Sequence, residues 1–411
     1  MPVIVVGRDE EDLKKYGETG TIYLGKHLVG TGEDAHTTTP VRMDILRPHI
    51  VCITGKRGSG KSFSLGIFVE EIMELPDNIR SNLCSLIIDT QGIFWTMKSA
   101  NEKDLLLLNK WDIKPKAYAN IHVSVPVGQE NIFFKSGVEY DSTFSISPNE
   151  LTPEDWLTVF ELKQTEPLGI LFYQIIKKMR GNYSLDDIIN TIHVQEGFAN
   201  EKLALKNYLE AAKGWGIFGD SEMPTILEGG KTTVLDVSLT PSNVRALLVS
   251  LIGRSVFTER VKARRKEELA DVEGIKIARV PMCWILIDEA HNFLPGIGRT
   301  PATDTLNRIV KEGRQPGITL VLATQRPEKL HPDALAQCDL ILSHRLTAKG
   351  DIDALKAIMQ TYMLFDITRY INELPKWKGT AIILDDNSER LYKVRVRPRK
   401  SWHAGSSPVA I

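Results

Sequence analysis

The feature that most restricts the fold is the segment Gly55-Lys-Arg-Gly-Ser-Gly-Lys-Ser62, which fits the pattern GxxxxGK[ST]. It follows the β-branched apolar run 49–54, typical of a buried parallel strand, and precedes a helix-like stretch from Phe63 to about Glu74. In this order the glycines let backbone N–H groups point at a phosphate, and the helix N-terminus adds its positive dipole end. A nucleoside triphosphate site is therefore predicted, with contacts from Gly55, Gly58, Ser59, Gly60, Lys61, Ser62 and Phe63.

A second apolar run, 282–287, ends in two adjacent acids, Asp288 and Glu289. Ligands of open α/β sheets bind at the carboxyl ends of the strands, where these acids are expected. We predict that ATP binds with Mg²⁺ held by Ser62 and Asp288, while Lys61 neutralises the β and γ phosphates. Glu289 is the predicted general base for the attacking water. His291 either contacts the nucleotide or caps the next segment.

Two further apolar runs are predicted to join the same sheet. The run 318–324 ends at Gln325, whose amide could sense the γ-phosphate or merely cap the strand. The run 84–89 ends at Asp89 and is followed by Gln91 and Gly92, which could simply form the turn.

The chain is predicted to be an α/β protein with an interrupted core, because more residues separate Lys61 from Asp288 than a minimal βαβ core requires. Much of the sequence between these two residues shows helical periodicity and signals for the start of helices. The predicted segments are a short β-rich N-terminal region (1–45), the first part of the ATPase core (46–150), an inserted α-helical subdomain (151–230), the second part of the core (231–388), and a C-terminal strand and bracing tail (389–411).

Composition excludes several classes of protein. Lys plus Arg number 51 and Asp plus Glu 52, so the chain is not a globally basic nucleic-acid binder, although a local basic surface stays possible. No apolar run is long enough to span a membrane, and the N-terminal residues do not resemble a secretory signal. The four separated cysteines indicate reduced, buried thiols in a cytoplasmic protein.

Together, these motifs resemble the HerA/FtsK group of P-loop translocases, and HerA most closely. Beyond the two sites above, the resemblance rests on Lys311-Glu-Gly-Arg314, Ala323-Thr-Gln-Arg-Pro327, the segment 338–346, Leu374-Pro375 and the basic tail 397–403. It implies a RecA-like P-loop NTPase core in a homo-oligomeric ring, expected to be a hexamer, that threads double-stranded DNA. It also implies a helicase role in DNA end processing and repair with a nuclease partner of the NurA type, and no membrane attachment.

The resemblance further assigns roles to single residues. Gln325 corresponds to the family's sensor, and Arg314 is the first candidate for the arginine supplied by a neighbouring subunit, with Arg345 as the second. Two departures stand out. Position 93 is Ile where the family often has a glutamate, and the N-terminal β region is shorter than the family's barrel, so that we expect a reduced barrel.

Two basic runs could meet nucleic acid or could be solvated surface: 260–266 near a helix end and 393–400 on the terminal strand. In the second run Lys393, Arg395 and Arg397 alternate with valines, which predicts one basic and one apolar face. The resemblance implies that this strand braces a neighbouring subunit.

Two other functions share the same core: a conjugation- or secretion-type pump, and an oligomeric ATPase subunit of an antiviral defence complex. The intact Asp288-Glu289 pair argues against a purely non-hydrolytic module.

Overall fold

The computed structural model describes residues 3–346, 348–359 and 367–405. Its framework is one 13-stranded sheet with the order β1-β3-β2-β13-β12-β11-β4-β10-β9-β5-β8-β6-β7. The strands are β1 (Ile4–Val6), β2 (Thr21–Val29), β3 (His36–Asp44), β4 (Ile50–Thr54), β5 (Leu83–Asp89), β6 (Ile121–Pro126), β7 (Ser142–Phe144), β8 (Thr232–Asp236), β9 (Met282–Ile287), β10 (Ile318–Thr324), β11 (Leu340–His344), β12 (Thr380–Asp385) and β13 (Arg390–Val396).

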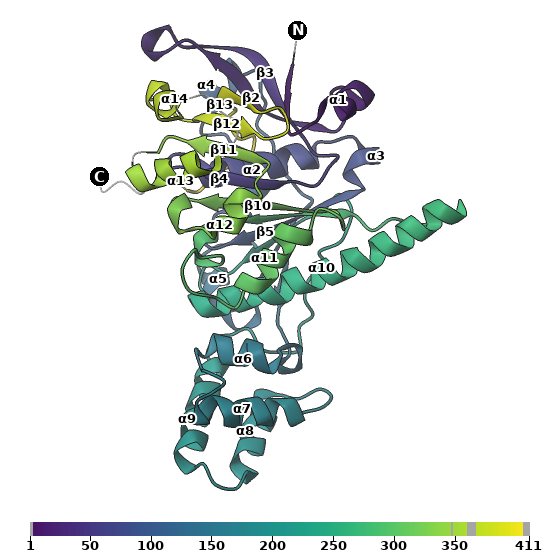
Figure 1. Cartoon of the computed structure of the whole chain (residues 1–411), viewed down its shortest axis with the longest axis vertical. Coiled ribbons are helices and arrows are strands. Elements are labelled where there is room, and N and C mark those ends of the chain that lie inside the picture. Colours follow the sequence, from purple (N-terminus) through teal and green to yellow (C-terminus); the bar gives the residue numbers. More distant parts are fainter. Residues whose placement is uncertain (1–2, 347, 360–366, 406–411) are drawn as a thin grey trace.

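Eight neighbouring strands, from β11 to β7, run parallel. Strands β4, β5, β8 and β10 are buried at every position, which explains why their sequences do not alternate between apolar and polar residues. Helices pack on both faces of this part (Figure 1). The fold is therefore α/β with a RecA-like core, as the sequence predicted.

The helices that accompany the sheet vary widely in length. They are α1 (Glu10–Tyr16), α2 (Lys61–Met73), α3 (Asp77–Arg80), α4 (Leu105–Lys110), α5 (Glu130–Lys135), α6 (Pro153–Val159), α7 (Pro167–Lys178), α8 (Leu185–Val194), α9 (Ala199–Lys213), α10 (Ser242–Glu273), α11 (Thr303–Glu312), α12 (Pro332–Ala336), α13 (Lys349–Met359) and α14 (Ile367–Glu373). None of these described helices is long and apolar enough to cross a bilayer.

The N-terminal strands extend the sheet at one edge. β13 lies antiparallel to both β12 and β2, and β2 pairs antiparallel with β3. Because β13 joins β2 to the core, the strands within residues 3–45 continue the main sheet. Their organisation as a reduced barrel stays a prediction.

Helices α6 to α9 form a group at one end of the molecule, beyond the sheet (Figure 1). Capping boxes at Thr152 and Ser184 begin α6 and α8, as the helix-start signals predicted. An aromatic cluster packs their interior: Trp156 stacks on Phe218 and lies edge-on to Phe172. This group sits inside the predicted insertion 151–230, whose limits as a domain stay a prediction.

The C-terminal segment 397–405 packs along helix α2, the helix that follows the glycine-rich loop. The guanidinium groups of Arg397 and Arg399 are fully buried, and both pair with the buried carboxylate of Glu70, at 2.9 and 3.3 Å. Glu71 also pairs with Arg397, at 2.9 Å. The prediction of a basic surface along this run is wrong at Arg397 and Arg399. The acids that neutralise them, Glu70 and Glu71, belong to α2, which is far away in the sequence but packs against this segment.

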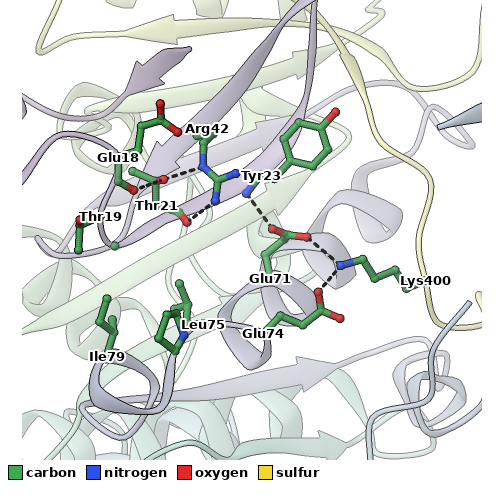
Figure 2. A pocket seen from close by; sticks show the side chains of 12 residues that line it. Glu18, Thr19, Thr21, Tyr23, Arg42, Glu71, Glu74, Leu75, Ile79 and Lys400 are labelled. Atoms are coloured by element: carbon green, nitrogen blue, oxygen red, sulfur yellow. Dashed lines mark hydrogen bonds and ion pairs between the residues drawn. The ribbon is translucent and has the colours of Figure 1, made fainter. Parts of the chain in front are cut away.

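A cavity of about 490 Å³ lies between the far end of α2 and the N-terminal strands. In Figure 2, Glu71 accepts a hydrogen bond from the backbone of Tyr23 and meets Lys400, while Arg42 of β3 donates to Thr21 of the neighbouring strand β2. Lys400 also pairs with Glu74. The cavity thus adjoins the C-terminal end of α2, whereas the glycine-rich loop lies at its N-terminal end.

Candidate nucleotide-binding site

The site is built at the carboxyl edge of three adjacent parallel strands. β4 pairs with β10, and β10 pairs with β9. The segments that follow these strands therefore meet: the glycine-rich loop after β4, Asp288 and Glu289 after β9, and Gln325 after β10. The order of the strands brings together residues that are far apart in the sequence.

The glycine-rich loop adopts backbone conformations that favour glycine. Gly58 has φ of 73° and Gly60, the residue before α2, has φ of 114°. A Cβ at Gly55 would lie 2.4 Å from the Ser59 hydroxyl, which leaves no room for another residue. That hydroxyl is buried without a hydrogen-bond partner among the described residues. The loop therefore holds a polar atom that a phosphate could satisfy.

Lys61 points into this loop. Its side chain is buried, and its ammonium donates to the backbone carbonyl of Lys56 at 3.3 Å. Burial lowers the pKa of Lys61, and the nearby carboxylates of Glu289 and Asp288 oppose that effect. An incoming phosphate would supply the close anionic partner that this cation lacks.

Ser62 and Asp288 converge on one point. The Ser62 hydroxyl donates to the Asp288 carboxylate at 2.5 Å, and Asp288 is fully buried. Burial raises the pKa of Asp288, and the hydrogen bond from Ser62 opposes the shift. A hydroxyl and a carboxylate oxygen are ligands that Mg²⁺ accepts when substrate phosphates and water complete its shell, so these two residues fit the ion.

Glu289 has a strained backbone and an unsatisfied oxygen. Its φ is 51°, which is uncommon for a residue other than glycine and is concentrated at functional sites. Its Oε2 is buried without a hydrogen-bond partner among the described residues, whereas Oε1 accepts a long bond from the Gln91 amide at 3.4 Å. Burial, followed by repulsion from Asp288, raises the pKa of Glu289. A carboxylate with these properties is suited to accept a proton from water.

His291 lies beside Glu289 and contacts the neighbouring strand. Its Nδ1 is 3.0 Å from the Thr324 hydroxyl at the end of β10 and 3.6 Å from Glu289 Oε2. Burial, with the positive charge of Arg326, lowers the pKa of His291 to about 4. The imidazole is therefore neutral near pH 7, and it links the ends of β9 and β10.

The three other predicted residues lie in different places. Gln325 is half-buried at the carboxyl edge, directly after β10. Arg345 follows β11, and its carbonyl accepts a bond from the Lys56 N–H at 3.2 Å, so it adjoins the loop of its own chain. Arg314 lies before β10, at the opposite edge of the sheet, and pairs with Asp339 at 2.9 Å. The seven residues of β10 separate it from the carboxyl edge by roughly 20 Å.

Three residues near the site were not assigned roles from the sequence. His344 is buried against Gly60 and contacts the Ser64 hydroxyl at 2.9 Å. Burial lowers the pKa of His344 to about 4, so the imidazole is neutral. The positive charge of Arg326 favours the charged form of Glu289. The Gln91 amide donates a hydrogen bond to Glu289. Gln91 and Arg326 each follow a strand that reaches the carboxyl edge, a position that could have identified them.

The turn after β5 is held by Asp89. Its carboxylate accepts the backbone N–H groups of Gln91, Gly92, Ile93 and Phe94. Ile93 is buried in the core, so this turn places an apolar side chain where the related family often has a glutamate. Burial and the adjacent Asp236 raise the pKa of Asp89 to about 7.

The basic run 260–266 is divided between structural and exposed residues. Arg260 is buried and donates to the carbonyls of Pro316 and Val280 and to Glu267. Arg264 pairs with Glu267 and Glu268. Exposed side chains remain at Lys262, Arg265 and Lys266.

The strand order and the loop geometry define this chain as a P-loop NTPase. The solved VirB4 of Thermoanaerobacter pseudethanolicus has a similar fold, with a TM-score of 0.55 at 12% identity over 93% of this chain and 97% of that one. The bacterial conjugative coupling protein TrwBΔN70 aligns with a TM-score of 0.52 at 12% identity over 87% of each chain.

Within that class, the model of the family described as "Helicase HerA, central domain" matches residues 22–256, more than half of the chain. The chain belongs to the HerA family. It is 22% identical to the DNA double-strand break repair helicase HerA of Sulfurisphaera tokodaii over 97% of this chain and 73% of that protein. It is 24% identical to a probable helicase of Methanocaldococcus jannaschii over 84% of this chain, and spans 61% of that relative's length.

Proposed function

We propose that this protein is a Mg²⁺-dependent, ATP-hydrolysing, ring-forming translocase or helicase that moves double-stranded DNA in end processing. The observation that carries the proposal is the convergence of Lys61, Ser62, Asp288 and Glu289 at one edge of the sheet, with Ser62 and Asp288 joined at 2.5 Å. The names of the HerA relatives support DNA as the substrate.

The proposed mechanism divides the reaction between these residues. The loop amides and Lys61 would bind the phosphates, and Ser62 with Asp288 would hold Mg²⁺, which would supply neutralisation of the phosphate charge. Glu289 takes the proton of the attacking water through Oε2, which has no hydrogen-bond partner among the described residues. Gln325, one strand away, senses the γ-phosphate.

The position of Arg314 supports a site completed by a second subunit. At the opposite edge of the sheet, it is too far away to reach the loop of its own chain, whereas a neighbouring subunit in a ring could receive it. An arginine at the transferring phosphoryl group stabilises the charge that develops there. Arg345, which adjoins the loop of its own chain, is the alternative, and the nuclease partner of the NurA type also stays part of the proposal.

The primary test compares steady-state ATPase rates with and without linear double-stranded DNA, for wild type and Glu289→Gln. We expect DNA to stimulate the wild type and the variant to be inactive in both conditions. An ATPase rate that does not respond to DNA would overturn the translocase proposal and favour a defence-complex subunit whose effector is another protein.

A mixing experiment tests Arg314. Arg314→Ala and Lys61→Ala subunits are each expected to be inactive, and a mixed ring should regain part of the activity because some interfaces contain both intact residues. If mixtures stay as inactive as their components while Arg345→Ala mixtures recover, Arg345 is the residue that acts across the interface.

A further inference from the structure

Two aromatic rings from distant parts of the chain meet beside the phosphate-binding loop. The rings of Phe63 and His403 form an edge-to-face pair, with centroids 5.3 Å apart and an angle of 87°. Phe63 directly follows Ser62 in the first turn of α2, and His403 belongs to the C-terminal segment 397–405. Both side chains are half-buried, so each retains an accessible surface.

The C-terminal segment holds His403 in place through buried ionic contacts. The Arg399 guanidinium donates to the Ser401 hydroxyl at 2.7 Å, to Glu70 at 3.3 Å and to His403 Nδ1 at 3.1 Å. Glu70 lies two turns along α2 from Phe63. The anchor that orients the imidazole is therefore part of the helix that begins at the phosphate-binding loop.

These contacts determine the hydrogen-bonding character of His403. An arginine can only donate, so Nδ1 must accept and the proton of the neutral ring is on Nε2. Burial, together with the charge of Arg399, lowers the pKa of His403 to about 3, which keeps the ring neutral. Among residues 3–346, 348–359 and 367–405, Nε2 has no hydrogen-bond partner. A Cβ at Gly405 would lie 2.5 Å from this atom, so the close approach of the chain to this edge of the ring requires glycine.

A flat apolar ring next to an oriented N–H donor has the chemistry of a purine site. Bases stack on aromatic side chains, and a ring nitrogen of a purine accepts a hydrogen bond from such a donor. We propose that Phe63 and His403 bind the purine base of the nucleotide whose phosphates lie at the loop, so that the C-terminal segment contributes to base recognition. The inference rests on the proposed nucleotide site.

Calorimetric titration can separate base recognition from phosphate binding. Mg·ATP and Mg·tripolyphosphate, which lacks the base and ribose, are titrated into wild type, His403→Ala and Phe63→Leu. We expect either variant to weaken ATP binding roughly tenfold, the range of a lost base stack, while the affinity for tripolyphosphate stays unchanged. Phe63→Leu retains an apolar side chain against the core and therefore controls for loss of packing.

Trp402→Ala is the matched control. Trp402 is an exposed aromatic residue next to His403 whose backbone bonds to Ser99 and Thr96 do not involve its ring. This variant should bind both ligands as the wild type does. His403→Ala and Trp402→Ala should melt within a few degrees of each other, because each removes a partly exposed ring.

Lys61→Ala distinguishes failure of this inference from failure of the proposed function. It should lose both ligands. If the wild type binds neither ligand, the proposed nucleotide site is wrong and this inference fails with it. If the wild type binds both but His403→Ala changes neither affinity, or changes both equally, the base-binding role is wrong while the nucleotide site stands.

Discussion

The two ends of helix α2 differ in how completely their buried charges are paired. At the N-terminal end, Lys61 has a single long bond to a carbonyl, and Glu289 beside it leaves one buried oxygen unpartnered. In the C-terminal half, Glu70 accepts bonds from two arginines, from Ser401 and from the Lys400 backbone. Burying a charge without partners is costly, so the first arrangement is suited to a ligand and the second to stability.

The largest expected effect is at the N-terminal end. Glu289→Gln should reduce the ATPase rate by roughly 10²- to 10⁴-fold, the range for loss of a general base. Because the lost carboxylate is partly unsatisfied, the free energy of unfolding should not fall. Steady-state ATPase assays and urea unfolding of the same preparation measure both quantities. A variant that loses activity and stability together would break the comparison.

The second-largest effect is expected in the C-terminal half of α2. Glu70→Ala leaves the guanidinium groups of Arg397 and Arg399 buried without their shared anion. Removing one partner of a buried ion pair typically lowers the free energy of unfolding by about 3–5 kcal/mol. Urea unfolding is the measurement, and Glu10→Ala, at a highly exposed acid, is the control that should change little. Equal stability of the two variants would contradict the structural role of Glu70.

A smaller effect is expected at Gly66, on the same helix. A Cβ there would lie 2.6 Å from the Arg399 guanidinium, which is pinned by its bonds. Replacing glycine by alanine inside a helix typically raises the free energy of unfolding by about 1 kcal/mol, whereas overpacking lowers it by about 1–3 kcal/mol. Gly66→Ala should therefore be destabilising on balance. Thermal melting should show the opposite sign for Gly350→Ala, where a Cβ has 3.9 Å of space. A stabilised Gly66→Ala would mean that Arg399 is not held as the structure indicates.

The smallest effect concerns pH. Burial raises the pKa of Glu289, so the folded state binds more protons than the unfolded one between the ordinary pKa and the raised one. Stability from this group therefore falls as pH rises through that window. For Glu70, burial would raise the pKa but Arg397 and Arg399 outweigh it, so its pKa is lowered and its stabilisation is lost as pH falls.

Unfolding measured from pH 4 to pH 7 tests this contrast. The stability advantage of Glu289→Gln over wild type should grow toward pH 7, while the deficit of Glu70→Ala should shrink toward pH 4. Parallel pH profiles for wild type and both variants would show that neither carboxyl titrates as described.

The parts of the site that could be predicted are those that short sequence patterns specify. The loop 55–62 and the acids 288–289 each follow a short apolar run, and the parallel sheet brings these runs side by side, as the α/β pattern implies. The roles of Glu289, Gln325 and Arg314 stay predictions. The burial of Arg397 and Arg399 could not be predicted, because their partners are more than 300 positions away and a basic run has the same local signature on a surface.

Side-chain contacts across strands were equally hidden from the sequence. The Gln91 amide reaches Glu289 only because β5 pairs with β9 and Asp89 shapes the turn. His344 reaches α2 because β11 pairs with β4. The position of each residue near a strand end indicated closeness to the site, but the contact itself depends on which strands pair.

The placement of β4 has a consequence for how the molecule folds. This strand carries the phosphate-binding loop, yet both of its neighbours, β10 and β11, lie more than 260 residues later in the chain. Forming such distant contacts requires closing very long loops, which slows folding. A nascent chain that has emerged only as far as β9 would contain the whole GxxxxGKS motif and still lack both strands that hold it. Competence to bind nucleotide should thus be acquired late during synthesis, in one step with closure of the central sheet.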